Sequence, residues 1–363
     1  MENKKNIPLL KKIVFSLFPL ILLFVITEIV LNVIYFQRKE NDVFATVFAF
    51  KKYKNKNKSA NKEKRYIRLR EHAALINEYI EPWDNYISQC DGLTKNKFLF
   101  RTDKYGFIEP SFRHQNSDLN VFFLGGSTTE CSFVNENERF VYLTGVYLDK
   151  LTGKKINTIN SGMSGNHSYH CINLLFNKII PLKADVCVLM ENINDWTTLF
   201  FEGSYYNENP SRSLIIDLNK KSKMIDDEWE NVRNKNTVLD TNKMYAQHIV
   251  ALRTFISICK LNGIKPVLMT QPNRYKINPD SSILNIIENK TSNTNFNYTQ
   301  MMKLQLGFNQ NIRRIAASED ITLIDLENEI PKSKDFIYDV VHLNSKGCIK
   351  AAEIISKQLK LTL

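Results

Sequence analysis

The sequence predicts an α/β fold, a three-layer α/β/α domain around a central, mostly parallel five-stranded sheet. Two observations predict it. From residue 119 onward, short and continuous apolar runs alternate with longer amphipathic stretches, as expected for parallel strands covered by helices on both faces. Glycine-containing turns and polar residues follow several of the apolar runs, and these are the strand ends at which open α/β sheets place their ligands.

Five strands and five helices are predicted in this part of the chain. The strands are 120–124, 155–160, 185–191, 265–270 and 321–326. The helices are expected near 136–151, 168–180, 242–262, 298–318 and 345–360. The alternation is interrupted at 196–240, a polar and aromatic insertion without strong periodicity, and insertions of this length often act as lids or binding loops.

The main domain is therefore assigned to 119–363, and residues 66–118 are predicted to be its N-terminal extension. A short helix is expected at 66–80. Residues 97–109 are expected to form a strand with a turn at 103–106, as part of a hairpin that leads into the main sheet.

The N-terminal region contains an apolar segment at 13–36, preceded by a short basic tail at 1–12. The segment has 24 residues, which exceeds the length of about 20 that a helix needs to cross a bilayer. It is too long for a signal-peptide core, and no small-residue cleavage site follows it. We therefore predict one N-terminal transmembrane helix at 13–36, with a buried helix of a soluble domain as the alternative.

The positive charge of the chain is concentrated near this segment. The net charge is +11, and residues 1–65 hold 14 Lys and Arg against five acids. A nucleic-acid enzyme would instead spread basic residues over its folded surface, so nucleic acid is excluded as a partner. The Lys/Asn-rich spacer at 37–65 is expected to bind anionic lipid headgroups through residues 38–65. The charge balance favours an extracytoplasmic main domain on a single-pass membrane protein.

The six cysteines are widely scattered, with neither metal-ligand spacing nor a disulfide-dense pattern. No spacing of His, Cys and carboxylate residues suggests a metal, so we expect no metal and no cofactor.

The strand predicted at 120–124 ends at Gly125 and Gly126, so Ser127 lies on a tight turn at the strand end. Glycines leave room for a substrate to approach the backbone, and a serine held there is presented outward, as in a nucleophile elbow. A phosphate-binding turn is the alternative. It is disfavoured because the lysine that a P-loop places after its glycines is missing.

Three further polar groups follow other strands. A turn at 160–166 contains two glycines and can direct backbone N–H groups at an anion. An amide and carboxylate cluster occupies 191–195, and Asp339 and His342 precede the last helix. Each group alone could be a helix cap, a permissive turn or a turn acid. Together they supply the nucleophile, base, orienting acid and oxyanion donors of an acyl-transfer site.

These four blocks resemble those of the SGNH hydrolases, the GDSL-like esterases and acyltransferases, over about residues 119–360. The resemblance implies a flavodoxin-like SGNH fold of the membrane-anchored type. It implies Ser127 as nucleophile, His342 as base and Asp339 as the acid that orients the base. The oxyanion hole would be formed by the backbone N–H groups of Ser127 and Gly165 and by the side-chain amide of Asn194.

Two departures from the family pattern are visible. The family's Gly-Asp-Ser-Leu is Gly-Gly-Ser-Thr here, which leaves the turn of the nucleophile intact. The glycine that usually stands two residues before the third-block Asn is replaced by Asn192, which alters the wall of the pocket. Asn192, Asp195 and Trp196 are the expected substrate contacts.

The resemblance implies a membrane-tethered serine esterase or O-acyltransferase that removes or transfers acetyl groups on a cell-surface polysaccharide. One alternative is a lipase or thioesterase with an apolar pocket beside Ser127. Another is an inactive SGNH scaffold in envelope polysaccharide assembly. Aromatic residues at 196–206 either stack on sugar rings or pack on the core, and the sequence leaves both open. They are Trp196, Phe200, Phe201, Tyr205 and Tyr206.

Overall fold

The computed structural model describes residues 9–36, 65–217, 228–235 and 237–363. The chain divides into two units, Met1–Lys64 and Arg65–Leu363. In the first unit the structure describes one helix, α1 (Leu9–Phe36), which includes the apolar segment 13–36. Over the residues that the structure describes, no helix combines the length and apolar character that a membrane crossing requires. The predicted transmembrane helix is therefore not supported, and most of the predicted spacer lies outside the described residues.

The second unit contains the predicted sheet. Its five strands are β4 (Leu119–Gly125), β5 (Ile156–Asn160), β6 (Val186–Met190), β8 (Lys265–Met269) and β9 (Thr322–Ile324). They run parallel in the order β5-β4-β6-β8-β9, so all five predicted strands are confirmed. From β4 the chain first adds β5 on one side and then adds β6 on the other side, so β4 lies at a topological switch point. Such a switch point is where open α/β sheets bind ligands.

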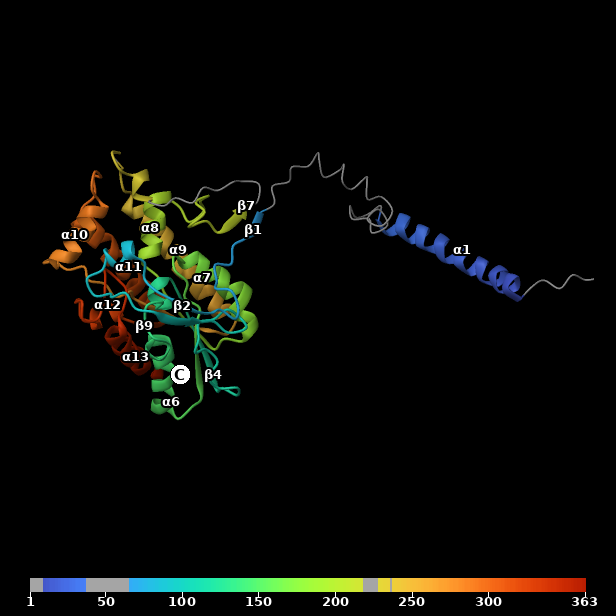
Figure 1. The fold of residues 1–363 in the computed structure, drawn as a ribbon, viewed down its shortest axis with the longest axis horizontal. Helices are drawn as coiled ribbons and strands as arrows, with labels where there is room; N and C mark the ends of the chain where they lie inside the picture. Colours follow the sequence, from blue (N-terminus) through green and yellow to red (C-terminus); the bar gives the residue numbers. More distant parts are fainter. Residues whose placement is uncertain (1–8, 37–64, 218–227, 236) are drawn as a thin grey trace, which may run out of the picture. The chain divides into compact units, whose positions relative to one another are not determined.

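Helices cover both faces of this sheet, which confirms the three-layer arrangement (Figure 1). One face is covered by α6 (Phe140–Thr152) and α13 (Ser345–Lys360). The other is covered by α7 (Ser168–Leu174), α9 (Thr241–Leu261) and α11 (Tyr298–Ser318). The predicted helix at 168–180 is α7 continued by a π-helical turn, η2 (Leu175–Ile179).

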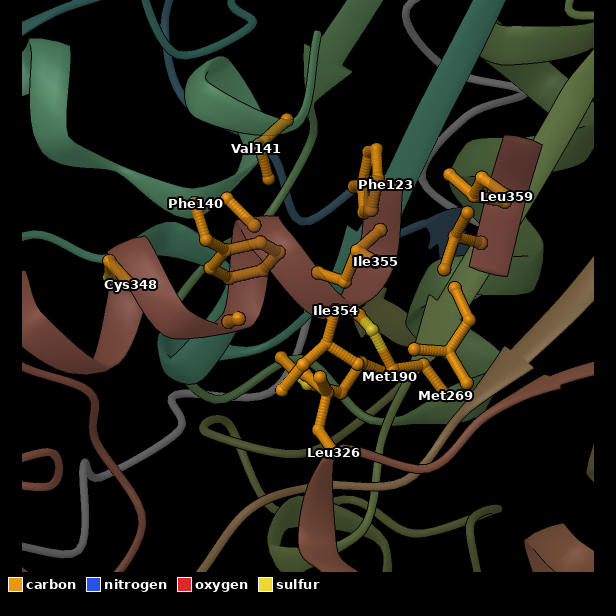
Figure 2. Packing of buried hydrophobic residues seen from close by; sticks show 14 of the residues in the cluster. Phe123, Phe140, Val141, Met190, Met269, Leu326, Cys348, Ile354, Ile355 and Leu359 are labelled. Atoms are coloured by element: carbon orange, nitrogen blue, oxygen red, sulfur yellow. The ribbon is translucent and has the colours of Figure 1, made fainter. Parts of the chain in front are cut away.

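The side chains of β4 alternate between two cores. Val121 and Phe123 pack against α6 and α13, and Figure 2 shows Phe123 among residues of those helices and of neighbouring strands. Phe122 and Leu124 point to the opposite core, under α7, α9 and α11. All four are fully buried. Full burial of such a side chain contributes about 1.5–3 kcal/mol, so burial on both faces explains the unbroken apolar run in the sequence.

The N-terminal extension differs from the prediction, because the helix expected at 66–80 is absent. Two short strands take its place, β1 (Arg65–Ile67) and β2 (Asn77–Ile80). β1 pairs antiparallel with β7 (Ile215–Asp217), and β2 pairs antiparallel with β3 (Phe98–Arg101). Pairing with partners far along the chain overrides the local pattern here, since strand formation depends strongly on tertiary context.

The strand and turn expected at 97–109 are present. β3 is followed by a turn in which Asp103 accepts hydrogen bonds from the N–H groups of Tyr105 and Phe107. Ile108 then bridges to Asn160 at the edge of the main sheet. The extension is thus attached to the sheet as predicted, although the hairpin partner of β3 is β2.

The predicted insertion at 196–240 begins within a helix, since Ile193–Glu202 form α8. It also contains β7 and η4 (Glu228–Asn231), while residues 218–227 and 236 lie outside the described part. Its aromatic residues at 196–206 differ in burial, and Phe201 is partly buried. Tyr206 is exposed, whereas Trp196, Phe200 and Tyr205 are buried in one cluster with residues of the core. Packing therefore accounts for these three side chains.

Candidate active site

Ser127 is the first residue of α5 (Ser127–Glu130), directly after β4 and its two glycines. A Cβ atom at Gly126 would lie 2.2 Å from Nδ2 of Asn194, and one at Gly125 would lie 2.8 Å from the carbonyl oxygen of Met190. Both glycines are thus needed for close packing. They allow the third-block asparagine to lie against the turn that carries Ser127.

His342 connects Ser127 to Asp339. Its Nε2 atom lies 2.7 Å from Oγ of Ser127, and its Nδ1 atom lies 2.7 Å from Oδ2 of Asp339. The other carboxylate oxygen, Oδ1, accepts hydrogen bonds from the N–H groups of Val341 at 2.9 Å and His342 at 2.8 Å. Asp339 and His342 therefore form one local unit, the base loop (residues 339–342), which the fold brings to a serine 215 positions away.

The electrostatics of the base loop favour an ionised Asp339. Burial alone would raise the pKa of this carboxyl group. The charge and hydrogen bond of His342, with the two backbone N–H groups, outweigh burial and lower the pKa to about 2. A carboxylate in this position holds the imidazole proton on Nδ1. Nε2 is then free to accept the proton of Ser127.

The three residues predicted to donate to the oxyanion lie on segments that contact one another. The N–H of Met163 donates to the carbonyl of Gly125, which attaches the loop of Gly165 to the Ser127 turn. Gly165 has φ +79°, a left-handed conformation that favours glycine. Asn194 lies beside both Gly126 and the carboxyl group of Glu191. Since an amide carries two N–H bonds, one can face Glu191 while the other remains available to a substrate oxygen.

We expect Asn194→Ala to lower kcat by about 10²–10³ while KM changes little, because one donor to the developing oxyanion is removed. Steady-state kinetics on an activated acetyl ester would measure both constants. The matched control is Asn289→Ala, which removes an exposed amide on a surface helix, α10 (Ser281–Lys290). If Asn194→Ala kept a kcat close to that of the wild type, Asn194 would have no role in the oxyanion hole.

The structure does not place Asn192 and Asp195, two of the three predicted substrate contacts, on an accessible surface, because both side chains are fully buried. Nδ2 of Asn192 donates to the backbone carbonyl of Gln305 at 2.9 Å and to Oδ1 of Asn309 at 2.7 Å. The carboxylate of Asp195 accepts hydrogen bonds from Ser168 and from the hydroxyl of Tyr205. These contacts fix the start of α8 and thereby position Asn194.

Trp196, the third predicted contact, reaches a cavity although it is only 3% exposed. The cavity has a volume of about 180 Å³ and lies beside the base loop, since Asp339 and His342 form part of its wall. The rest of the lining is mostly aromatic and aliphatic. It includes Ile193, Trp229, Tyr275, Ile287, Met301 and Val340, together with one cation, Lys290.

Sequence reasoning missed the contribution of the extension. Nη2 of Arg70 donates to the carbonyl of Ser164 at 2.6 Å, and the guanidinium lies against Gly165. Burial, followed by the charges of neighbouring arginines, lowers the pKa of Arg70 to about 10. His72 contacts Glu130 at 2.8 Å, and Glu130 also accepts a hydrogen bond from Ser164. Residues 70–72 therefore stabilise the loop that carries Gly165, and no motif in the sequence predicted this role.

Within the described ranges, no group of three or more His, Cys, Asp or Glu side chains is arranged to hold a metal ion. All six cysteines are free thiols, and five of them are buried.

No protein-family model matches the chain, and no curated protein matches it. Several solved structures are similar. An acetylxylan esterase from Geobacillus stearothermophilus has a TM-score of 0.44 at 16% identity, over 67% of this chain and 95% of the esterase. A GDSL-like lipase from Parabacteroides merdae has a TM-score of 0.43 at 16% identity, over 69% of this chain and 100% of the lipase. An α/β hydrolase from the metagenome of Lake Arreo, Spain, has a TM-score of 0.42 at 14% identity, over 67% and 94%.

Proposed function

We propose that the protein is a serine-dependent esterase or O-acyltransferase. Ser127 is the nucleophile, His342 the base, and Asp339 the acid that orients the base. The observation that supports this is the continuous chain from Ser127 through His342 to Asp339, with 2.7 Å at each step. Nucleophile and base within hydrogen-bond reach, with a third group orienting the base, is the arrangement that nucleophilic catalysis requires.

In this mechanism Oγ of Ser127 attacks the ester carbonyl while Nε2 of His342 takes the hydroxyl proton. The negative charge that develops on the carbonyl oxygen is stabilised by hydrogen bonds from the N–H groups of Ser127 and Gly165 and from the amide of Asn194. The ester C–O bond then breaks, and His342 returns the proton to the leaving alcohol. Water or a second hydroxyl attacks the acyl-enzyme, with His342 again as base, and this releases Ser127.

The experiment that tests the proposal is covalent labelling of the full chain, purified in detergent, with a fluorophosphonate. Mass spectrometry should find the adduct on the peptide that contains Ser127, and the same preparation should release acetate from 4-nitrophenyl acetate. A folded protein that shows neither labelling nor turnover would instead be the inactive scaffold.

The substrate we propose is an acetylated cell-surface polysaccharide, which the resemblance to SGNH enzymes implies. Acetyl transfer to an added oligosaccharide, in place of acetate release, would identify a transferase. A lipase or thioesterase is the second candidate, and one observation favours it. The cavity beside His342 is mostly apolar, as expected of a site for an apolar group.

The two candidates differ in how the rate depends on acyl length. For a carbohydrate acetylesterase, kcat/KM on 4-nitrophenyl esters should fall steeply beyond acetate. For the second candidate, kcat/KM should rise toward medium-length acyl chains, because each buried CH₂ contributes about 0.8 kcal/mol. A gain of about 1.4 kcal/mol corresponds to a tenfold higher kcat/KM. A series from acetate to decanoate would measure this, with Trp196→Ala as the variant that enlarges the cavity.

We also propose, from the sequence, that residues 13–36 hold the catalytic domain at a membrane and on its extracytoplasmic side. What supports this is the apolar segment with basic residues on both flanks. The protein is then expected to stay in the membrane fraction after alkaline carbonate washing, and protease added outside sealed cells should cleave the catalytic domain. Release by carbonate would contradict the anchor, and protection from protease would contradict the orientation.

A further inference from the structure

A tyrosine of the N-terminal extension extends the hydrogen-bonded chain of the active site. Tyr86 lies on a short helix, α4 (Asp84–Ile87). Its hydroxyl donates to Oδ2 of Asp339 at 3.2 Å and lies 3.3 Å from Nδ1 of His342. The chain of polar groups therefore has four members, and the last comes from a segment far from the other three in the sequence.

The carboxylate of Asp339 shows why this hydroxyl matters. Oδ1 is bound by two backbone N–H groups of the base loop, and Oδ2 is bound by Nδ1 of His342 and by Tyr86. Among the described residues, Tyr86 is the only donor to this carboxylate that lies outside the base loop. Within the described ranges, it is thus the one hydrogen bond that joins this carboxylate directly to another part of the domain.

The hydroxyl of Tyr86 is held in place and kept protonated. Its ring lies 5.0 Å from the ring of Trp83 and 5.6 Å from that of Phe133, centre to centre. Burial, followed by the charge of Asp339, raises the pKa of Tyr86. The other titratable groups around it are Tyr338, with a hydroxyl at 3.4 Å, and Cys90. A raised pKa favours the protonated hydroxyl, which is the form that can donate to Asp339.

The segment that carries Tyr86 is also attached to Tyr338, the residue directly before the base loop. The N–H groups of Asp91 and Gly92 both donate to the carbonyl of Tyr338, and the buried Arg274 forms an ion pair with Asp91. A Cβ atom at Gly92 would lie 2.9 Å from Cα of Tyr338, so the two backbones are in close contact. This attachment sets the position of the Tyr86 hydroxyl over Asp339.

We propose that Tyr86 is a positioning residue, which holds the Asp339 carboxylate so that His342 keeps its alignment with Ser127. The N-terminal extension is then a part of the active site. The role as stated rests on the proposed esterase function and deepens it.

The test is Tyr86→Phe in the full chain, since phenylalanine keeps the ring and removes only the hydroxyl. We expect kcat to fall by about tenfold or more, which corresponds to one hydrogen bond to a charged group, while KM changes by less than about twofold. The control is Tyr79→Phe, an exposed tyrosine on β2 of the same extension, and it should behave like the wild type. An unchanged kcat, an effect on KM alone, or an equal loss in the control would overturn the proposal.

A second measurement does not depend on turnover. Solvent exchange of the His342 Nδ1 proton can be followed by NMR in the wild type and in Tyr86→Phe. We expect faster exchange in the variant, because Asp339 loses the donor that anchors it. If the wild type is not an esterase but the exchange still accelerates, the positioning role stands while the proposed function fails. Equal exchange rates in the two proteins would overturn the positioning role.

Discussion

Ser127→Ala is expected to abolish fluorophosphonate labelling and to lower kcat on an activated acetyl ester by about 10⁵–10⁶. In the proposed mechanism Oγ of Ser127 forms the covalent bond, and it is the hydroxyl that lies within hydrogen-bond reach of Nε2 of His342 in the described structure. A residual rate of about 10³–10⁴ over water can persist, because the oxyanion donors remain.

The measurement combines labelling, single-turnover kinetics and thermal unfolding of the same preparations. Ser127→Ala removes only one oxygen from a partly exposed side chain at the start of α5, so the unfolding temperature should stay close to that of the wild type. The matched control is Ser292→Ala, an exposed serine after α10, which should be labelled normally. Labelling of Ser127→Ala at the rate of the wild type would show that another residue is the nucleophile.

Asp339→Asn is expected to lower kcat by about 10⁴. An asparagine at this position no longer supplies a negative charge to the imidazolium, and its amide can donate to Nδ1 and select the wrong tautomer. Nε2 would then carry the proton and could not accept the proton of Ser127. Because the pKa of Asp339 is about 2, the wild-type carboxylate stays charged at every pH above roughly 4. A fall in wild-type activity between pH 4 and 7 therefore cannot come from protonation of Asp339.

Rates of Asp339→Asn and the wild type across this pH range would test both statements. Asp335→Asn is the matched control, since Asp335 is exposed and lies only four positions earlier. An Asp339→Asn variant within about tenfold of the wild type would remove Asp339 from the mechanism.

Two long helices of the main domain could be predicted closely because their signals are local. Helix α13 begins and ends at the predicted residues, 345 and 360, with Asn344 as a cap that accepts a hydrogen bond from the N–H of Gly347. Helix α11 likewise matches 298–318, with a capping box at Asn297 and Gln300. Amphipathic periodicity and capping residues lie within a few positions of one another, so a single sequence contains them.

The site could be predicted in part for a related reason. Ser127, Gly165 and Asn194 each follow a parallel strand, and parallel strands end at one edge of the sheet. Asp339 and His342 lie on one short loop. Their proximity therefore followed from the alternation of strands and helices.

The environment of these residues could not be predicted in the same way. Asn192 and Asp195 are adjacent in sequence to a predicted site residue, yet they are buried by contacts with α11 and α7. Polarity at a strand end does not show whether a side chain faces a substrate or the neighbouring helix, because that depends on which helix covers it.

The sequence by itself thus determined the order of the five parallel strands and the candidate reactive groups, since both depend on nearby residues. Only the tertiary structure decided which side chains support those groups. Arg70 and Tyr86 reach the site from an extension without any recognisable motif, and their partners lie 94 and 253 positions away. Contacts at such separations arise from the packing of the whole domain, and no local pattern encodes them.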